Sequence, residues 1–293
     1  MILSVPRAFG RRVRRRSVVA DKAMTWMETA RVLVRDDPIL IFSMGKTGTT
    51  SLAETLEAAT GRPVVKAHAL SSSGHARRLE KSRRLEIVER PRFLWAAEWI
   101  RHDLRLRRHH RWDIICGVRD PVALAVSDHF YGLRLQAEIG VQPERRHDDI
   151  DGHAQAVANG LDALFHREDW FADELRTVTG IDVYATPFPH EQGYRIYEQG
   201  RFRVLLTRFE DLPVVGPVAL KEFFGLSDPV PIPARNVGLS GDTDDESLYR
   251  RFVTEGALPA AVLETAYDTR VARHLYSDAE RAEFAARWSG AAV

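Results

Sequence analysis

Residues 38–61, PILIFSMGKTGTTSLAETLEAATG, are compatible with few folds, because an apolar run is followed at once by a glycine-rich turn and a helical pattern. The apolar run is typical of a buried strand and ends at Gly45. Beyond the turn, Leu52 and Leu56 recur at helical spacing until Gly61, and glycine commonly ends a helix. The segment therefore predicts a strand, a tight turn and a helix.

Further apolar runs predict three more strands, at Pro63–His68, Asp113–Val118 and Phe202–Thr207. The second of these precedes Asp120 and Pro121, which suit the N-cap and the first position of a helix. Another helix is expected at residues 214–224, and residues 149–200 read as two helices and a compact loop. Strands that alternate with helices indicate an α/β fold, a P-loop-type three-layer sandwich whose central, mostly parallel sheet is flanked by helices.

The chain divides into a basic arm with a leading helix, residues 1–36, and one α/β domain, residues 37–293. Six arginines and no acid precede Asp21, so the arm is a candidate for peripheral contact with an anionic membrane. The net charge is only +1, and nucleic acid is not an expected partner. The lone Cys116 and the lack of an apolar stretch of about 18 residues predict a cytoplasmic protein. The sequence does not indicate an oligomeric state.

Basic side chains follow the predicted strands. They are Lys46, His68, Arg119 and Arg208. Ligands of open parallel sheets bind beyond the carboxyl ends of the strands, so we expect an anion site there. For Arg208, a structural ion pair with Glu210 is the favoured interpretation over contact with a ligand.

The glycine-rich turn differs from an ATP-binding loop. The pattern G-x-x-x-x-G-K-[ST] needs a glycine where this chain has Leu40. Arg119 follows the neighbouring strand, and arginine repels a divalent cation and binds an oxyanion itself. Asp120 is the remaining magnesium candidate, although helix capping suits its position better. The turn and the amides of residues 49–51 therefore suit a doubly anionic nucleotide bound without a metal.

Three segments in this order resemble sulfotransferases that use 3′-phosphoadenosine 5′-phosphosulfate (PAPS). MGKTGTTSL is similar to their 5′-phosphosulfate loop, and VRDPVALAVSDHF is similar to their 3′-phosphate element. VLLTRFEDL followed by LKEFFGL resembles a strand, turn and helix of the same superfamily. The segment DWFADELRTVTGIDVYATPFPHEQGYRIY is more narrowly similar to bacterial capsular polysaccharide synthesis proteins, which are themselves sulfotransferase-like.

The resemblance implies a role for each residue of these motifs. The residues that would hold the 5′ end of the nucleotide are Gly45, Lys46, Thr47, Gly48, Thr49, Thr50 and Ser51. Lys46 would also offset the negative charge of the departing diphosphate. Ser51 stands where the family often has an aromatic residue against adenine, so the residues that hold adenine are not identified. Arg119 and Ser127 would bind the 3′-phosphate.

The segment RPVVKAHAL resembles the Lys-Thr-His element of cytosolic sulfotransferases. Alternation along a strand places Lys66 and His68 on one face. His68 is the candidate catalytic base, because an imidazole can take a proton from a hydroxyl near neutral pH. Glu98 and His102, one helical turn apart, are the alternatives.

The resemblance implies a sulfotransferase that moves a sulfuryl group from PAPS to a hydroxyl of a carbohydrate or a small glycosylated metabolite. Two alternatives stay open: a P-loop kinase or NTPase that uses ATP and magnesium, and a non-catalytic nucleotide-binding scaffold. The acceptor would contact residues 71–111 and 149–200, and covering segments of this kind carry no readable code for their ligand.

Overall fold

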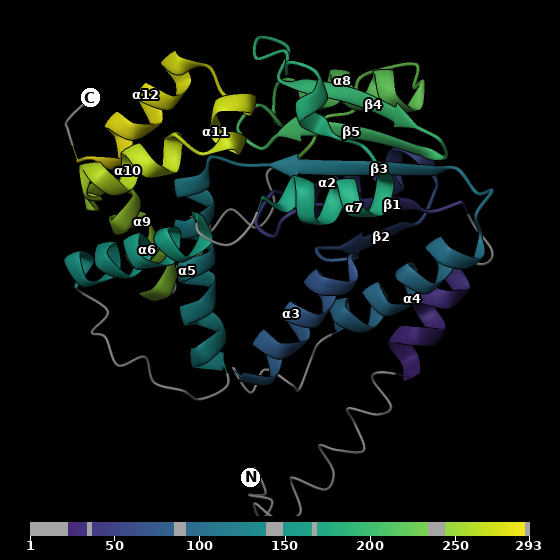
Figure 1. Cartoon of the computed structure of the whole chain (residues 1–293), viewed down its shortest axis with the longest axis horizontal. Helices are drawn as coiled ribbons and strands as arrows, with labels where there is room; N and C mark the ends of the chain where they lie inside the picture. Colours follow the sequence, from purple (N-terminus) through teal and green to yellow (C-terminus); the bar gives the residue numbers. More distant parts are fainter. Residues whose placement is uncertain are drawn as a thin grey trace, which may run out of the picture.

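The structure is a computed structural model that describes residues 23–33, 37–84, 92–138, 149–165, 169–233 and 244–290. A sheet of five strands, in the order β2-β1-β3-β5-β4, forms its centre (Figure 1). The strands are β1 (Ile39–Phe42), β2 (Val64–Ala67), β3 (Trp112–Val118), β4 (Tyr194–Gln199) and β5 (Phe202–Arg208). All neighbouring strands are parallel except β4 and β5. The prediction of an α/β fold with a mostly parallel sheet is confirmed, whereas its assignment to the P-loop type stays a prediction.

Helices α2 (Thr49–Thr60) and α8 (Gly216–Phe224) cover one face of the sheet. Ile41 from the sheet shares one apolar cluster with Leu52 of α2 and Phe223 of α8. Alternate residues of each strand point to this face, since successive side chains of a strand alternate in direction.

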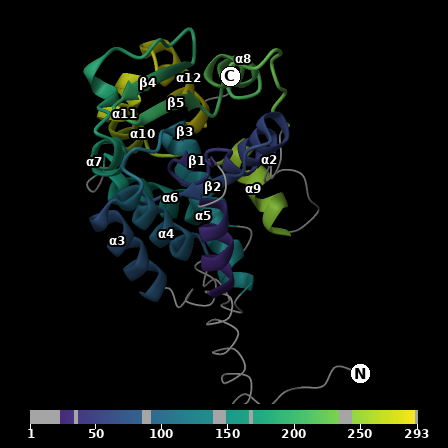
Figure 2. The same ribbon diagram turned by 90° about the vertical axis from the view of Figure 1, so that its right-hand side faces the viewer.

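The opposite face is covered by α3 (Ser72–Arg84), α4 (Arg92–Leu106), the π-helical turn η2 (Phe171–Arg176), α7 (Thr177–Thr179) and the 3₁₀ turn η3 (Val183–Ala185). Phe42 and Cys116 of the sheet lie in one cluster with Ile100 of α4 and Phe171 of η2. Figure 2 shows α3 and α4 together on this side, with α8 on the other. The sheet therefore has a helical layer on each face, and Cys116 is a buried core residue.

A further group of helices packs beside the sheet, next to the end of β3 from which α5 leaves (Figure 1). It comprises α5 (Pro121–Glu138), α6 (Ile150–Phe165), α9 (Asp244–Glu255), α10 (Ala260–Tyr267) and α12 (Asp278–Trp288), and α11 (Arg270–Leu275) connects the last two. These helices have an apolar cluster of their own, which includes Val126, Leu161 and Phe252. The chain from Asp244 to Trp288 is thus mainly helical.

The order of the strands reverses between β1 and β3. From β1 the chain passes through α2 to β2 on one side, whereas β3 lies on the other side of β1. Ligands of open α/β sheets bind where the order reverses in this way. Lys46 and Arg119 follow these two strands, so the fold brings the two predicted cations to the reversal point.

Strand β4 is a correction to the sequence analysis, which described residues 149–200 as two helices and a compact loop. The chain turns at Gly200, where φ is 56°, and β4 pairs antiparallel with β5 from Tyr194↔Thr207 to Gln199↔Phe202. Two antiparallel strands joined by a two-residue turn form a β-hairpin. Helix α6 at residues 150–165 fits the expected helical content of this region.

Residues 23–33 form a helix ahead of the sheet. The basic residues of the arm lie outside the described residues, so the membrane contact predicted for them stays a prediction, as does the division at residue 36. Among the helices that the structure describes, none is long and apolar enough to cross a bilayer.

Candidate functional site

The turn between β1 and α2 contains two residues in the left-handed backbone region. Lys46 has a φ of 66° and is the one non-glycine residue with positive φ in the described part of the chain, and Gly48 has a φ of 73°. A side chain in this region costs about 1–2 kcal/mol, and such strain persists where the surroundings hold it. A Cβ at Gly48 would also lie 3.0 Å from the Phe209 ring. Other parts of the protein therefore hold the turn in its shape.

Hydrogen bonds fix the base of the turn. The carbonyl of Met44 accepts from Oγ of Ser43 and from Oγ1 of Thr47, each at 3.0 Å. Thr47 is 1% exposed, and a Cβ at Gly117 of β3 would meet its side chain at 3.0 Å. The Thr47 hydroxyl is thus directed into the protein, and a contact of Thr47 with a ligand would be made by its amide.

The positive end of α2 lies directly beyond this turn. The first backbone bond of the helix joins the Leu52 amide to the Gly48 carbonyl at 3.1 Å, so the amides of Thr49 and Thr50 precede the helical ladder. The N-cap residue, Gly48, has no side chain to cap them, and no acidic residue lies in the first turn. A Cβ at Gly45 would meet no atom within 4 Å. The helix begins at Thr49 as predicted, with space beside the turn and a positive dipole end.

Arg119 joins the end of β3 to the turn. Its Nη1 donates to the Lys46 carbonyl at 3.2 Å, and its guanidinium carbon lies 4.4 Å from the centre of the Phe209 ring. Its Nε is buried and has no hydrogen-bond partner within the described ranges. Arg119 therefore supports the strained residue of the turn while its positive charge stays beside that of Lys46.

One face of α5 lies next to Lys46. Ser127, Tyr131 and Arg134 recur at the spacing of a helix face, and Nζ of Lys46 lies 4.2 Å from the centre of the Tyr131 ring. Burial lowers the pKa of Lys46, the positive charge of Arg134 lowers it further, and Asp128 acts in the opposite direction. Sequence reasoning missed Tyr131 and Arg134, which the helical spacing from Ser127 would have indicated.

His68 contacts the base of the same turn. Its Nδ1 lies 2.8 Å from the Ser43 carbonyl oxygen, so a neutral ring carries its proton on Nδ1 and Nε2 is the basic nitrogen. Burial, followed by the positive charge of Arg78, lowers the pKa of His68 to about 4, although the bond to Ser43 acts in the opposite direction. His68 is therefore neutral at pH 7, which is the form that a catalytic base requires.

The alternative bases, Glu98 and His102, belong to the layer formed by α3 and α4. Oε1 of Glu98 lies 3.7 Å from Nε2 of His75 on α3. His102 is exposed, and its ring lies against Trp99 at 6.0 Å. Of the three candidates, His68 is the one bonded to the turn, and the geometry therefore favours it.

Arg208 is not part of this group, although it also follows a strand. It is 4% exposed and donates to Asp211 and, at 2.8 Å, to Glu280 of α12. The predicted pairing of Arg208 with Glu210 is wrong, because Asp211 and Glu280 supply its carboxylate partners. The interpretation of Arg208 as a structural residue agrees with these contacts.

Asp120 caps helix α5, as predicted. Its Oδ1 accepts from the Val122 amide at 3.0 Å and from the Tyr267 hydroxyl at 2.9 Å, and its Oδ2 accepts from Nε1 of Trp288 at 3.0 Å. Burial raises the pKa of Asp120. Oε1 of Glu210 accepts from the Asp120 amide at 2.8 Å. Both carboxylates are thus used to fix the chain directly after Arg119.

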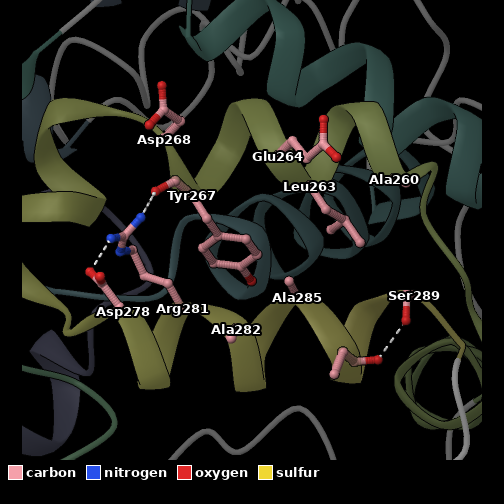
Figure 3. Close-up of a pocket in the computed structure, with 11 residues that line it drawn as sticks. Ala260, Leu263, Glu264, Tyr267, Asp268, Asp278, Arg281, Ala282, Ala285 and Ser289 are labelled. Atoms are coloured by element: carbon pink, nitrogen blue, oxygen red, sulfur yellow. Dashed lines mark hydrogen bonds and ion pairs between the residues drawn. The ribbon is translucent and has the colours of Figure 1, made fainter.

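A hollow lies between α10 and α12 (Figure 3). Its volume is about 730 Å3, and Figure 3 shows the Tyr267 ring between the two helices. Arg281 closes one end by donating to Asp278 at 2.5 Å and to the Tyr267 carbonyl at 3.0 Å. No predicted site residue lines this hollow. In the described ranges, no three His, Cys, Asp or Glu side chains are grouped as for a metal ion.

Comparison with known proteins relates part of the chain to a family. The family described as Putative capsular polysaccharide synthesis protein matches residues 161–245, less than a third of the chain. The matched part includes η2, β4, β5 and α8 but not Lys46, His68 or Arg119. No curated protein and no solved structure matches the chain. The match suggests a function related to polysaccharides.

Proposed function

We propose that this chain is a sulfotransferase that moves the sulfuryl group of PAPS to a hydroxyl of a carbohydrate or a small glycosylated metabolite. One observation carries the proposal: Arg119 donates to the carbonyl of Lys46 at the point where the strand order reverses. Two fixed cations and a helix N-terminus around one point suit a donor that carries two separate phosphate groups.

The residues of this site fit the two ends of such a donor. Lys46 and the amides of Thr49 and Thr50 suit the 5′-phosphosulfate, because they combine positive charge with hydrogen-bond donors. Arg119 and Ser127 suit the 3′-phosphate, since a guanidinium binds phosphate oxygens in pairs. When bound, PAPS supplies an activated sulfuryl group, and every other contribution comes from the chain.

In the proposed reaction, Nε2 of His68 takes the proton from the acceptor hydroxyl. The acceptor oxygen then bonds to sulfur as the bond from sulfur to the phosphate oxygen breaks, and the electron pair leaves with adenosine 3′,5′-diphosphate. Lys46 stabilises the negative charge on that departing oxygen. An anionic donor beside His68 stabilises the imidazolium and raises its pKa from about 4 toward the working pH.

The family match supports a carbohydrate acceptor, because it relates the chain to polysaccharide synthesis. A reaction in the cytoplasm and independence from a metal ion are parts of the same proposal. The cations at the reversal point support the second part, since a divalent ion would be repelled there.

Transfer of labelled sulfate from PAPS to a panel of glycans tests the proposal. We expect product with the wild-type protein, none with Lys46→Ala, and a raised KM for PAPS with Arg119→Ala. Lys221→Ala on α8 is the matched control and keeps wild-type activity. Unchanged turnover in Lys46→Ala would remove Lys46 from the mechanism.

The alternatives give different results with the same protein. A kinase or NTPase would be stabilised against heat by ATP with magnesium more than by adenosine 3′,5′-diphosphate. A scaffold would be stabilised by the diphosphate but would transfer no sulfate to any acceptor of the panel. We expect stabilisation by the diphosphate together with transfer.

A further inference from the structure

The π-helical turn η2 (Phe171–Arg176) lies against the segment that follows β2. A π-helical turn holds one more residue than an α-helical turn and is often found at functional sites. Asp169 caps it by accepting from the amides of Phe171 at 3.1 Å and Ala172 at 3.3 Å. The turn lies within the residues matched by the family, although the site residues lie outside them.

Glu174 of this turn is a buried carboxylate bonded to the chain after His68. It is 3% exposed, and its Oε2 accepts from the amides of Leu70 and Ser71, each at 2.8 Å. Its Oε1 accepts from the Ser71 hydroxyl at 2.7 Å. A buried carboxylate is tolerated when hydrogen bonds compensate its lost hydration. A Cβ at Gly74 would lie 1.5 Å from Oε1, so the neighbouring helix is shaped around this carboxylate.

Trp170, the residue before the turn, is bonded to His68 itself. Its Nε1 donates to the His68 carbonyl oxygen at 3.0 Å. Its ring lies 4.9 Å from the ring of Phe42, the last residue of β1. Trp170 therefore connects the carboxyl end of β1, where the turn with Lys46 begins, to the residue after β2.

The bonds from Trp170 and Glu174 hold the segment between β2 and α3, which has no regular secondary structure. Residues 68–71 belong to neither β2 nor α3, so their backbone groups are outside the sheet ladder. Trp170 fixes the carbonyl of His68, and Glu174 fixes the amides two and three residues further on. The direction of the His68 side chain follows from this backbone, and the Ser43 carbonyl then sets the ring orientation.

We propose that Trp170 and Glu174 are positioning residues for His68, which hold its backbone so that the imidazole stays bonded to the Ser43 carbonyl. The inference rests on the proposed function, in which His68 is the base. It also gives the family-matched segment a role: the matched residues orient a base that lies about 100 residues earlier in the chain.

The test compares variants of these two residues with matched controls in the full chain. Trp170→Phe removes the bond to His68 and keeps an aromatic ring against Phe42. Its control is Trp112→Phe at the start of β3, a buried tryptophan whose Nε1 has no partner in the described residues. Glu174→Ala removes all three bonds, and Glu174→Gln restores an acceptor and a donor of the same shape. The control for Glu174→Ala is Asp103→Ala, which removes a buried carboxylate bonded to Arg107.

Three readouts separate positioning from folding. We expect Trp170→Phe and Glu174→Ala to lower kcat by about 10- to 100-fold, since a misplaced catalytic group has effects of this size. The affinity for adenosine 3′,5′-diphosphate should stay within about twofold of wild type, because the turn at Lys46 keeps its own bonds. In NMR of labelled histidine, the Nδ1-protonated form of His68 should lose its dominance, because the ring is no longer held against the Ser43 carbonyl. Glu174→Gln should recover most of the lost kcat, and both controls should keep it.

Each result decides the inference. A kcat equal to that of the matched control, or an unchanged His68 tautomer, overturns it. If Glu174→Ala does not fold, Trp170→Phe decides, because it keeps the buried ring. If the wild-type protein transfers no sulfate, the proposed function fails, but the NMR comparison still shows whether Trp170 and Glu174 orient His68.

Discussion

The pKa of His68 predicts a pH dependence of stability that His68→Asn should remove. Burial holds the pKa of His68 at about 4 in the folded protein, whereas an unfolded histidine titrates near 6.5. Between these values the unfolded chain binds a proton that the folded chain does not, so stability rises with pH. The contribution is complete above the unfolded pKa and is lost as the pH falls to the folded pKa. The interval corresponds to about 3 kcal/mol of unfolding free energy.

Urea denaturation of both proteins at several values between about pH 7 and about pH 4 measures this contribution. Asparagine keeps an N–H group that can donate to the Ser43 carbonyl, so the variant removes the titration more than the contact. His75, His110 and His274, whose pKa values are also lowered, occur in both proteins and cancel. We expect wild type to lose about 3 kcal/mol more than the variant over this range. Parallel curves would refute the reasoning.

Three further predictions concern the turn and its surroundings. Gly48→Ala should lower the unfolding free energy by about 2 kcal/mol, because a Cβ there is strained and 3.0 Å from a neighbouring ring; Gly61→Ala, which is strained but has open space, should cost less in the same urea titration. Arg208→Met should cost on the order of 3 kcal/mol at unchanged nucleotide affinity, and weaker nucleotide binding at unchanged stability would return Arg208 to the site. Arg134→Ala should raise the pKa of Lys46 in an NMR titration, because the positive charge of Arg134 contributes to its lowering; an unchanged pKa would contradict this.

The parallel strands could be predicted from the sequence because each is a short apolar run that ends at a turn or a charged residue. Strand β4 could not be predicted in this way. Buried and exposed residues do not alternate along it, and the segment before it is rich in proline, glycine and tyrosine. The hairpin with β5 stabilises it, and that pairing places β4 at the edge of the sheet. The local sign of the hairpin was Gly200, which the sequence analysis assigned to a loop.

Ligand-binding residues are expected directly after parallel strands. This rule correctly predicted which side chains lie together, except where a residue distant in sequence pairs with one of them. Lys46 and Arg119 are in contact through a backbone carbonyl, and His68 is bonded to the base of the same turn. Arg208 obeys the same rule in sequence but is bonded to Glu280, 72 residues away. Contacts over such distances depend on how the C-terminal helices pack, and periodicity along the chain does not report this.

Trp170 and Glu174 escaped sequence reasoning for a similar reason. Each reaches backbone groups more than 100 residues earlier, and a buried tryptophan or glutamate on a helical turn gives no local sign of such a bond. Tyr131 differs, because its spacing from Ser127 places it on the same face of α5. That spacing was present in the sequence and would have identified it.

The central claim is that the turn and Arg119 recognise a nucleotide with two separate phosphate groups and without a metal. Calorimetric binding of adenosine 3′,5′-diphosphate and of adenosine 5′-phosphate, both with a chelator present, tests it most directly. We predict binding of the diphosphate that is at least about tenfold tighter, and loss of this preference in Arg119→Ala. Equal affinity for the two nucleotides, or binding that appears only when magnesium is added, would contradict the claim.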